Sequence, residues 1–137
     1  MKDDNCIFCK IISGEIPSAT IFEDDKFKVI LDRFPGNIGH VLILPKKHYS
    51  DIFEIDEDTA ADLFRLAVKV AKNMKSVLGF EAMNVVQNNG SLAGQTVHHF
   101  HMHLIPRYDN DKVNIKWEQL DLTDEQIAEV REKLSMN

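Results

Sequence analysis

The amino-acid sequence predicts an α+β fold with a five-stranded antiparallel sheet, one long helix and short helices near both ends. Two observations carry this prediction: short runs rich in β-branched residues between turn-forming residues, and one long run with helical periodicity. The predicted strands, in chain order, are Thr20–Phe22, Lys26–Asp32, His40–Leu44, Ala82–Gln87 and Val97–Ile105. Three strands, a helix and two more strands, joined by short connections, are typical of an antiparallel sheet.

The elements before the long helix are bounded by glycine and proline. A short helix is predicted over residues 6–13, and Gly14 and Pro17 end it. Pro35-Gly36-Asn37 marks the turn between the second and third predicted strands. Pro45 ends the third strand because proline has no N–H to donate to a ladder.

The long helix is predicted over residues 57–78. Its apolar residues recur at spacings of three and four, namely Ala60, Leu63, Phe64, Ala67, Ala71, Met74 and Leu78. Acidic residues at 56–58 suit the positive end of the helix dipole, and Gly79 is typical of the residue that follows a helix. A last helix is predicted to begin at Thr123, which can form a capping box with Gln126.

Composition limits the class of protein. A chain of 137 residues with 44% hydrophobic residues is long enough for one domain with its own core. The net charge of -6 disfavours non-specific binding to nucleic acid, which depends on basic residues. Because no apolar run is long enough for a membrane span or a secretory signal, we expect a cytoplasmic protein without membrane or nucleic-acid partners.

Histidines are concentrated in one segment. Four of the six histidines lie in residues 97–105, and strand alternation would place His99, His101 and His103 on one face. The first and third would then be about 13 Å apart, too far for one ion to bind all three. Packed histidines on an ordinary sheet are the alternative, but the preceding glycine-containing loop at residues 88–96 favours a functional site that binds an anion.

The same segment resembles the signature of the histidine triad (HIT) superfamily. The resemblance rests on Gly94-Gln95-Thr96-Val97-x-His99-Phe100-His101-Met102-His103-Leu104-Ile105. Residues 7–12 (IFCKII), 14–17 (GEIP) and 39–48 (GHVLILPKKH) are also similar to segments of the superfamily. The pattern is that of the Hint-like branch in its longer bacterial form. The resemblance implies one HIT domain over residues 1–137, with a core at 6–107 and a C-terminal tail at 108–137 that carries a short helix.

The resemblance also implies a reaction. Members cleave at the α-phosphate of purine nucleotides through a covalent nucleotidyl-histidine. No cluster of carboxylates is expected to face the three histidines, so we expect the chemistry to need no divalent cation. His101 matches the nucleophile, and His103 matches the residue that contacts the α-phosphate oxygens. The other positions that match catalytic residues are His40, Thr96 and His99.

Further positions match the nucleotide-binding residues of the superfamily. Backbone groups of Gly94, Gln95 and Val97 would complete a phosphate cradle, and Asn88 would lie near the ribose and phosphate. Asp32 matches the acidic residue that accepts the ribose hydroxyls, although a solvated turn carboxylate is an equal interpretation. The base pocket would consist of positions that otherwise suggest core, namely Ile7, Phe8, Ile11, Ile30 and Leu42. Arg33 departs from the apolar residue usual at its position.

A zinc site is predicted near the N-terminus. Cys6-x-x-Cys9 supplies two ligands, and a closed tetrahedral site needs two more. The resemblance to the bacterial branch implies that His48 and His99 complete a structural zinc site. A reduced buried pair without metal and a redox-active pair are the alternatives, and His98 is a competing ligand that strand alternation points away.

Three functions remain open from the sequence. The first is a hydrolase of nucleoside phosphoramidates or acyl-nucleotides with an AMP-like or GMP-like ligand. The second is a Fhit-like hydrolase of dinucleoside polyphosphates, and the third is a non-catalytic, zinc-stabilised nucleotide-binding module. The resemblance implies a homodimer, which would agree with the wide apolar face of the 57–78 helix.

Overall fold

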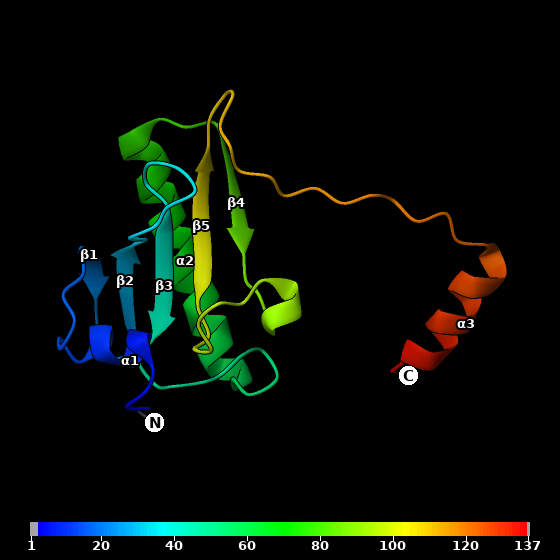
Figure 1. The fold of residues 1–137 in the computed structure, drawn as a ribbon, viewed down its shortest axis with the longest axis horizontal. Coiled ribbons are helices and arrows are strands. Elements are labelled where there is room, and N and C mark those ends of the chain that lie inside the picture. The colour runs from blue at the N-terminus through cyan, green and yellow to red at the C-terminus, as the bar shows by residue number, and fades with distance from the viewer. Residues whose placement is uncertain (1–2, 137) are drawn as a thin grey trace.

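The fold is a five-stranded antiparallel sheet, in a computed structural model that describes residues 3–136 (Figure 1). The strands are β1 (Thr20–Glu23), β2 (Phe27–Leu31), β3 (Val41–Pro45), β4 (Ala82–Val86) and β5 (Met102–Arg107). Their spatial order is β1-β2-β3-β5-β4, and each neighbouring pair is antiparallel. The predicted fold class is therefore confirmed.

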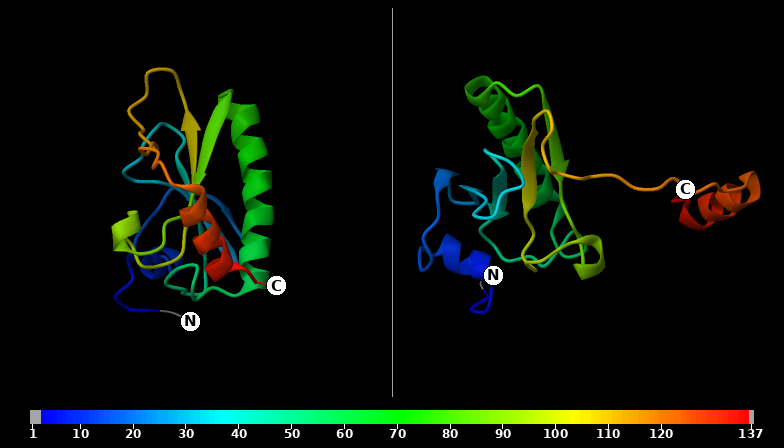
Figure 2. Two further views of the ribbon diagram at one scale, coloured as in Figure 1. Left: turned by 90° about the vertical axis from the view of Figure 1, so that its right-hand side faces the viewer. Right: turned by 45° about the horizontal axis from the view of Figure 1, so that its top comes forward.

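Two buried clusters cover the two faces of the sheet. Helix α2 (Glu57–Leu78) packs on one face, where Val29, Ile43 and Leu104 form a core with its apolar stripe. Helix α1 (Ile7–Ile12) lies on the opposite face, which Figure 2 shows from the side. Because side chains alternate along a strand, Ile30 and Leu42 point to the α1 face and pack there with Phe8 and Cys9.

Helix α2 has the bounds that the sequence predicts. The Asp56 side chain accepts a hydrogen bond from the N–H of Thr59, and Gly79 ends the helix with φ 74°. The buried stripe, however, consists of Leu63, Ala67, Val70 and Met74. Phe64 and Leu78, which were expected in that stripe, are 52% and 44% exposed. They lie on its flank, because the sheet covers only a narrow arc of the helix.

The predicted strand at residues 97–105 is wrong in its first half. Strand β5 begins at Met102, and residues 97–101 lie outside the strand ladder, with the backbone bent at residues 97–99. The Phe100 N–H donates to the Tyr49 carbonyl rather than to a ladder partner. Of the three histidines expected on one strand face, only His103 lies on a strand, so the other two are placed by loop geometry.

The chain after β5 extends away from the sheet (Figures 1 and 2). Helix α3 (Asp124–Leu134) begins with the predicted capping box between Thr123 and Gln126, and within its described residues it buries none. The division into a core at 6–107 and a tail at 108–137 stays a prediction. Among the described residues, no helix is long and apolar enough to cross a membrane.

A pair of neighbouring substitutions tests the position of the α2 stripe. Leu63→Ala should lower the free energy of unfolding by about 2–5 kcal/mol, because it leaves a cavity at a fully buried position. Phe64→Ala should cost less than about 1 kcal/mol in the isolated chain, since this side chain is half exposed. Urea denaturation at low protein concentration measures both, and equal losses would contradict the observed packing.

Candidate functional site

Cys6, Cys9, His48 and His99 form a tight cluster beside α1. Their ligand atoms lie within 4.8 Å of one another. Cys6 is the N-cap of α1, and one helical turn brings the Cys9 N–H within 3.3 Å of its sulfur. His48 follows β3, and His99 lies in the bend before β5, so tertiary folding completes the set.

The spacing of these ligand atoms fits a tetrahedral metal site. The Nδ1 atoms of His48 and His99 are 3.1 Å apart, and the sulfur-to-Nδ1 distances are 3.3–3.6 Å. Ordinary zinc bond lengths at tetrahedral angles require about 3.3 Å between two nitrogens and about 3.6 Å between nitrogen and sulfur. These four residues could therefore hold a metal ion. The competing ligand His98 is exposed and lies 3.4 Å from the Ser91 hydroxyl, outside the cluster.

His99 also has the tautomer that a metal ligand needs. Its Nε2–H donates to the Pro45 carbonyl at 2.8 Å, which leaves Nδ1 unprotonated toward the two sulfurs. A ligating histidine usually donates its second N–H to a carbonyl or carboxylate in this way. Burial lowers the pKa of His99 to about 4, so the ring is neutral at pH 7.

Asp32, His40 and His103 form a second cluster, where β2 ends and β3 begins. The first cluster lies near the other end of β3, at Pro45. His40 Nε2 lies 2.9 Å from Nδ1 of His103 and 3.4 Å from the Asp32 carboxylate. The Gly36 N–H donates to His40 Nδ1 at 2.9 Å. His40 therefore carries its proton on Nε2 and donates it to His103, which in turn carries its own proton on Nε2.

The two clusters differ in what their histidines can bind. A metal on His40 Nε2 would move the proton to Nδ1, where it would face the Gly36 N–H, a second donor. The second cluster is thus arranged to orient hydrogen bonds rather than to hold a cation. Burial lowers the pKa of His40, and it lowers the pKa of His103 to about 4.

His101 lies between the two clusters. Its Nδ1–H donates to the His99 carbonyl at 2.6 Å, which leaves the lone pair on Nε2. The Phe8 and His103 rings each make an edge-to-face contact with it, at a centroid separation of 4.9 Å. Burial lowers its pKa. The described chain gives Nε2 of His101 no hydrogen-bond partner, so this atom is available as a nucleophile.

The loop before the histidines is organised by Gln95. Its buried side chain accepts from the Gly90 N–H at 2.7 Å and donates to the carbonyls of Ser50 and Val97. This side chain is therefore used inside the protein and is not free to meet a ligand. Gly94 has φ 95°, and a Cβ there would lie 3.6 Å from Asn88, so the two residues are adjacent.

Some of the remaining predicted site residues lie together on the α1 face of the sheet. Thr96 is exposed, and Val97 packs against the buried apolar cluster on the α1 face of the sheet. Four of the five base-pocket candidates, Phe8, Ile11, Ile30 and Leu42, belong to that buried cluster. Ile7, the fifth, is 47% exposed and lies outside it. Asp32 accepts the N–H of Phe34 as well as facing His40, so it is more than a solvated turn carboxylate.

Sequence reasoning missed several groups that hold the site. Two of them are backbone groups, the Gly36 N–H and the Pro45 carbonyl, and no side-chain pattern reveals such groups. The third is Asp111, which binds Asn37 and Arg107. The spacing Arg107-x-x-x-Asp111 was a weak signal for an ion pair, but its distant partner Asn37 left no local trace.

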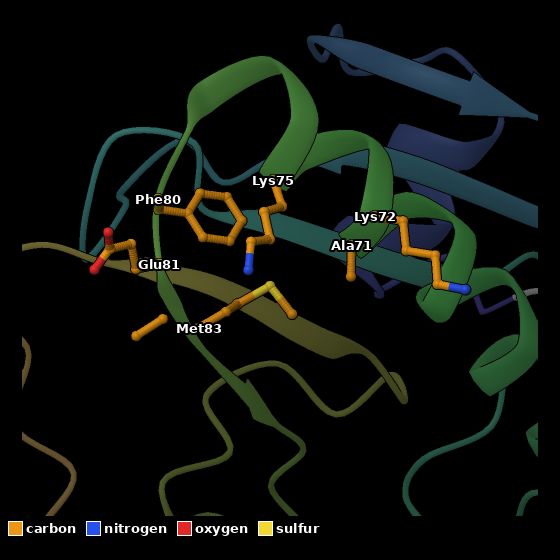
Figure 3. A pocket seen from close by; sticks show the side chains of 7 residues that line it. Ala71, Lys72, Lys75, Phe80, Glu81 and Met83 are labelled. Atoms are coloured by element: carbon orange, nitrogen blue, oxygen red, sulfur yellow. The ribbon is translucent and has the colours of Figure 1, made fainter.

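A separate pocket lies between α2 and the start of β4 (Figure 3). Its lining contains none of the predicted site residues and consists of Ala71, Lys72, Lys75, Phe80, Glu81, Ala82 and Met83.

Known proteins resemble this chain over most of its length. An uncharacterised HIT-like protein of Methanocaldococcus jannaschii is 43% identical over 129 residues, which are 92% of this chain and 98% of the relative. An adenosine 5'-monophosphoramidase of Schizosaccharomyces pombe is 36% identical over 96% of each chain. An adenylylsulfatase of Arabidopsis thaliana is 38% identical over 79% of this chain and 55% of the relative.

Solved structures share the fold. A protein of Streptococcus mutans superposes with a TM-score of 0.93 at 33% identity, over 97% of this chain and 85% of the other. A zinc-bound histidine triad family protein of Mycobacterium smegmatis superposes with a TM-score of 0.75 at 35% identity, over 82% of each chain. The HIT domain profile matches residues 13–110. The chain therefore belongs to the HIT domain family, and relatives named as HINT proteins and phosphoramidases support the Hint-like branch.

Proposed function

We propose that this chain hydrolyses purine nucleoside phosphoramidates or acyl-nucleotides at the α-phosphate, through a covalent nucleotidyl-His101. The observation that carries the proposal is the fixed tautomer of His101, whose Nδ1–H binds the His99 carbonyl while Nε2 carries a lone pair. The relative from Schizosaccharomyces pombe, named an adenosine 5'-monophosphoramidase, supports this substrate class.

His101 is the nucleophile of the first chemical step. Its Nε2 lone pair attacks phosphorus, the Nε2–P bond forms, and the bond from phosphorus to the leaving nitrogen or oxygen breaks. The positive charge that develops on the ring is stabilised by the His99 carbonyl at Nδ1–H. Water protonates the leaving group, and the resulting hydroxide equivalent attacks phosphorus in the second step. The Nε2–P bond then breaks, and one water is consumed overall.

His103 and His40 supply a hydrogen bond to the reacting phosphate. The His40 donor fixes Nδ1 of His103 as an acceptor, so His103 presents Nε2–H. This donor stabilises charge on a phosphate oxygen without giving up its proton. The Val97 N–H and the exposed Thr96 hydroxyl would bind the other phosphate oxygens. The N–H groups of Gly94 and Gln95, which were predicted to join this cradle, instead donate to the carbonyls of Ser91 and Gly90 at 3.0 and 3.1 Å.

The nucleoside would extend from the histidines toward β2 and α1. We assign Asp32 to the ribose hydroxyls, because its carboxylate adjoins His40 and keeps some exposure. Asn88 would lie near the ribose and phosphate. The apolar residues Ile7, Phe8, Ile11, Ile30 and Leu42 would border the base, with exposed Ile7 at the rim.

Zinc would have a structural role at Cys6, Cys9, His48 and His99. When bound, the ion supplies tetrahedral cross-linking of α1, the chain after β3 and the bend before β5. His99 would transmit this order to His101 through its carbonyl. The zinc-bound relative from Mycobacterium smegmatis supports the choice of metal.

The homodimer stays a prediction. Exposed apolar residues of α2, among them Phe64, Val68 and Val77, favour it. Light scattering after gel filtration tests it, and a monomer at high protein concentration would contradict it.

Replacing the proposed nucleophile should abolish turnover. His101→Ala should reduce kcat for adenosine phosphoramidate by about a thousandfold or more, because a covalent step loses its nucleophile. Binding of AMP should persist, and mass spectrometry of trapped wild-type enzyme should locate the adenylyl group on His101. The exposed His98 provides the control, since His98→Ala should keep activity. Turnover by the His101 variant would contradict the assignment.

The same assay separates the alternative functions. Faster turnover of diadenosine polyphosphates than of phosphoramidates would favour the Fhit-like hydrolase. AMP binding without turnover of any of these substrates would favour the non-catalytic module.

The pH profile should report neutral imidazoles. Because burial lowers the pKa of His103 to about 4 and also that of His40, kcat/KM should stay level from pH 8 to below 6.5 and fall at lower pH. The Asp32 charge raises both pKa values, so Asp32→Asn should shift the acidic limb to still lower pH. A limb at or above pH 6.5 in the wild type would contradict this picture.

Loss of the metal from Cys6, Cys9, His48 and His99 should lower the thermal stability of the protein. Purified protein should contain about one zinc per chain, and Cys9→Ser should lose most of it and lower the melting temperature by several degrees. His98→Ala is again the matched control and should retain zinc. Elemental analysis and thermal unfolding measure both effects, and a metal-free wild type with unchanged stability on zinc addition would argue against the site.

A further inference from the structure

We propose that Asp111 is a positioning residue for the catalytic histidine pair, because it anchors the turn whose Gly36 N–H sets the tautomer of His40. The inference rests on the proposed function for its kinetic consequence, but its structural consequence concerns the free protein alone. Asp111 lies beyond the end of β5, and its hydrogen-bond partners among the described residues include no histidine.

The Asp111 carboxylate is fully used as an acceptor. Its side chain is 6% exposed and receives Nε and Nη2 of Arg107 at 2.8 and 2.9 Å. It also receives Asn37 Nδ2 at 2.9 Å and the Tyr108 N–H at 3.0 Å. These bonds hold the pKa of Asp111 well below its usual range. An amide of the same shape has one acceptor oxygen, so it cannot replace this set.

Asn37 passes this anchoring to His40. Its side chain donates to the Pro106 carbonyl as well as to Asp111, and its own carbonyl accepts the His40 N–H at 3.1 Å. The turn over residues 36–40 is thereby attached to the end of β5. Val113, whose carbonyl accepts from Arg107, also packs close to Gly36. Three long-range contacts therefore hold the turn that brings the Gly36 N–H to His40 Nδ1: Asn37 with Pro106, Asn37 with Asp111, and Gly36 with Val113.

Losing the Gly36 donor would reverse the direction of the hydrogen bonds. The proton of His40 could then occupy Nδ1, and His40 Nε2 would become an acceptor toward His103. His103 would have to donate from Nδ1, which would leave a lone pair on its Nε2. That lone pair would repel a phosphate oxygen instead of binding it. The expected defect is therefore in the chemical step more than in substrate binding.

The test compares Asp111→Asn with Asp109→Asn. Asp109 is an exposed carboxylate two residues away for which the described chain shows no hydrogen bond, so it controls for the loss of charge. Long-range ¹H–¹⁵N correlation spectra of the substrate-free protein report the tautomer of each histidine. Wild type and Asp109→Asn should show His40 protonated on Nε2, and Asp111→Asn should show the Nδ1 form or a mixture.

Kinetics supply the second readout. Asp111→Asn should lower kcat for adenosine phosphoramidate roughly tenfold to a hundredfold, as expected for a misplaced catalytic group, with a smaller change in KM. Circular dichroism at the assay temperature must show the variant folded. Asn37→Ala should give the same tautomer change with Arg107–Asp111 intact, and the double variant should add little to either single one.

The outcomes separate this inference from the proposed function. An unchanged His40 tautomer in folded Asp111→Asn, or additive effects with Asn37→Ala, would overturn the positioning role. If the wild-type protein hydrolyses no nucleotide but Asp111→Asn still changes the His40 tautomer, the positioning role is supported while the proposed function fails. A kcat loss equal to that of Asp109→Asn would overturn it as well.

Discussion

The histidine site depends on the three bonds that fix His99. Its Nδ1 faces the sulfurs of Cys6 and Cys9, its Nε2–H binds the Pro45 carbonyl, and its own carbonyl accepts the Nδ1–H of His101. The first two orient the ring, and the third orients the neighbouring imidazole. Because His99 is fully buried, no water competes for these bonds. A cluster that could hold a metal is thus joined to His101 through one residue.

Backbone partners decide what each imidazole can do. His99 and His40 are both buried and neutral, yet one faces a carbonyl and the other faces an N–H. The carbonyl leaves His99 a lone pair toward the thiols, which suits a cation. The N–H leaves His40 a proton toward His103, which suits an anion at the next ring. The same residue type is therefore prepared for ligands of opposite charge near the two ends of β3.

The sheet keeps these two arrangements in register. His40 immediately precedes β3, and Pro45 ends it. The Gly36 N–H contact to His40 and the Pro45 carbonyl contact to His99 therefore lie at opposite ends of one strand. Its fully buried Ile43 and Leu44 pack on the two faces of the sheet. Such a strand has little freedom to slip, because a shift by one residue would move apolar side chains to the wrong face. Strand β3 thereby sets the distance between the Cys6–Cys9–His48–His99 cluster and the Asp32–His40–His103 cluster.

Local signals in the sequence determined the features that depend on neighbouring residues. These are the bounds of α2 at residues 57 and 78, the Thr123 capping box, and the closeness of Cys6 and Cys9 across one helical turn. The HIT resemblance grouped His48 and His99 with the two cysteines, although these residues are far apart in the chain. Alternation failed at residues 97–101, because the bonds of Phe100 to Tyr49 and of His99 to Pro45 replace a strand ladder there. Tautomers, and the link from Asp111 through Asn37 to His40, were decided by tertiary structure alone, since each depends on groups far apart in the chain.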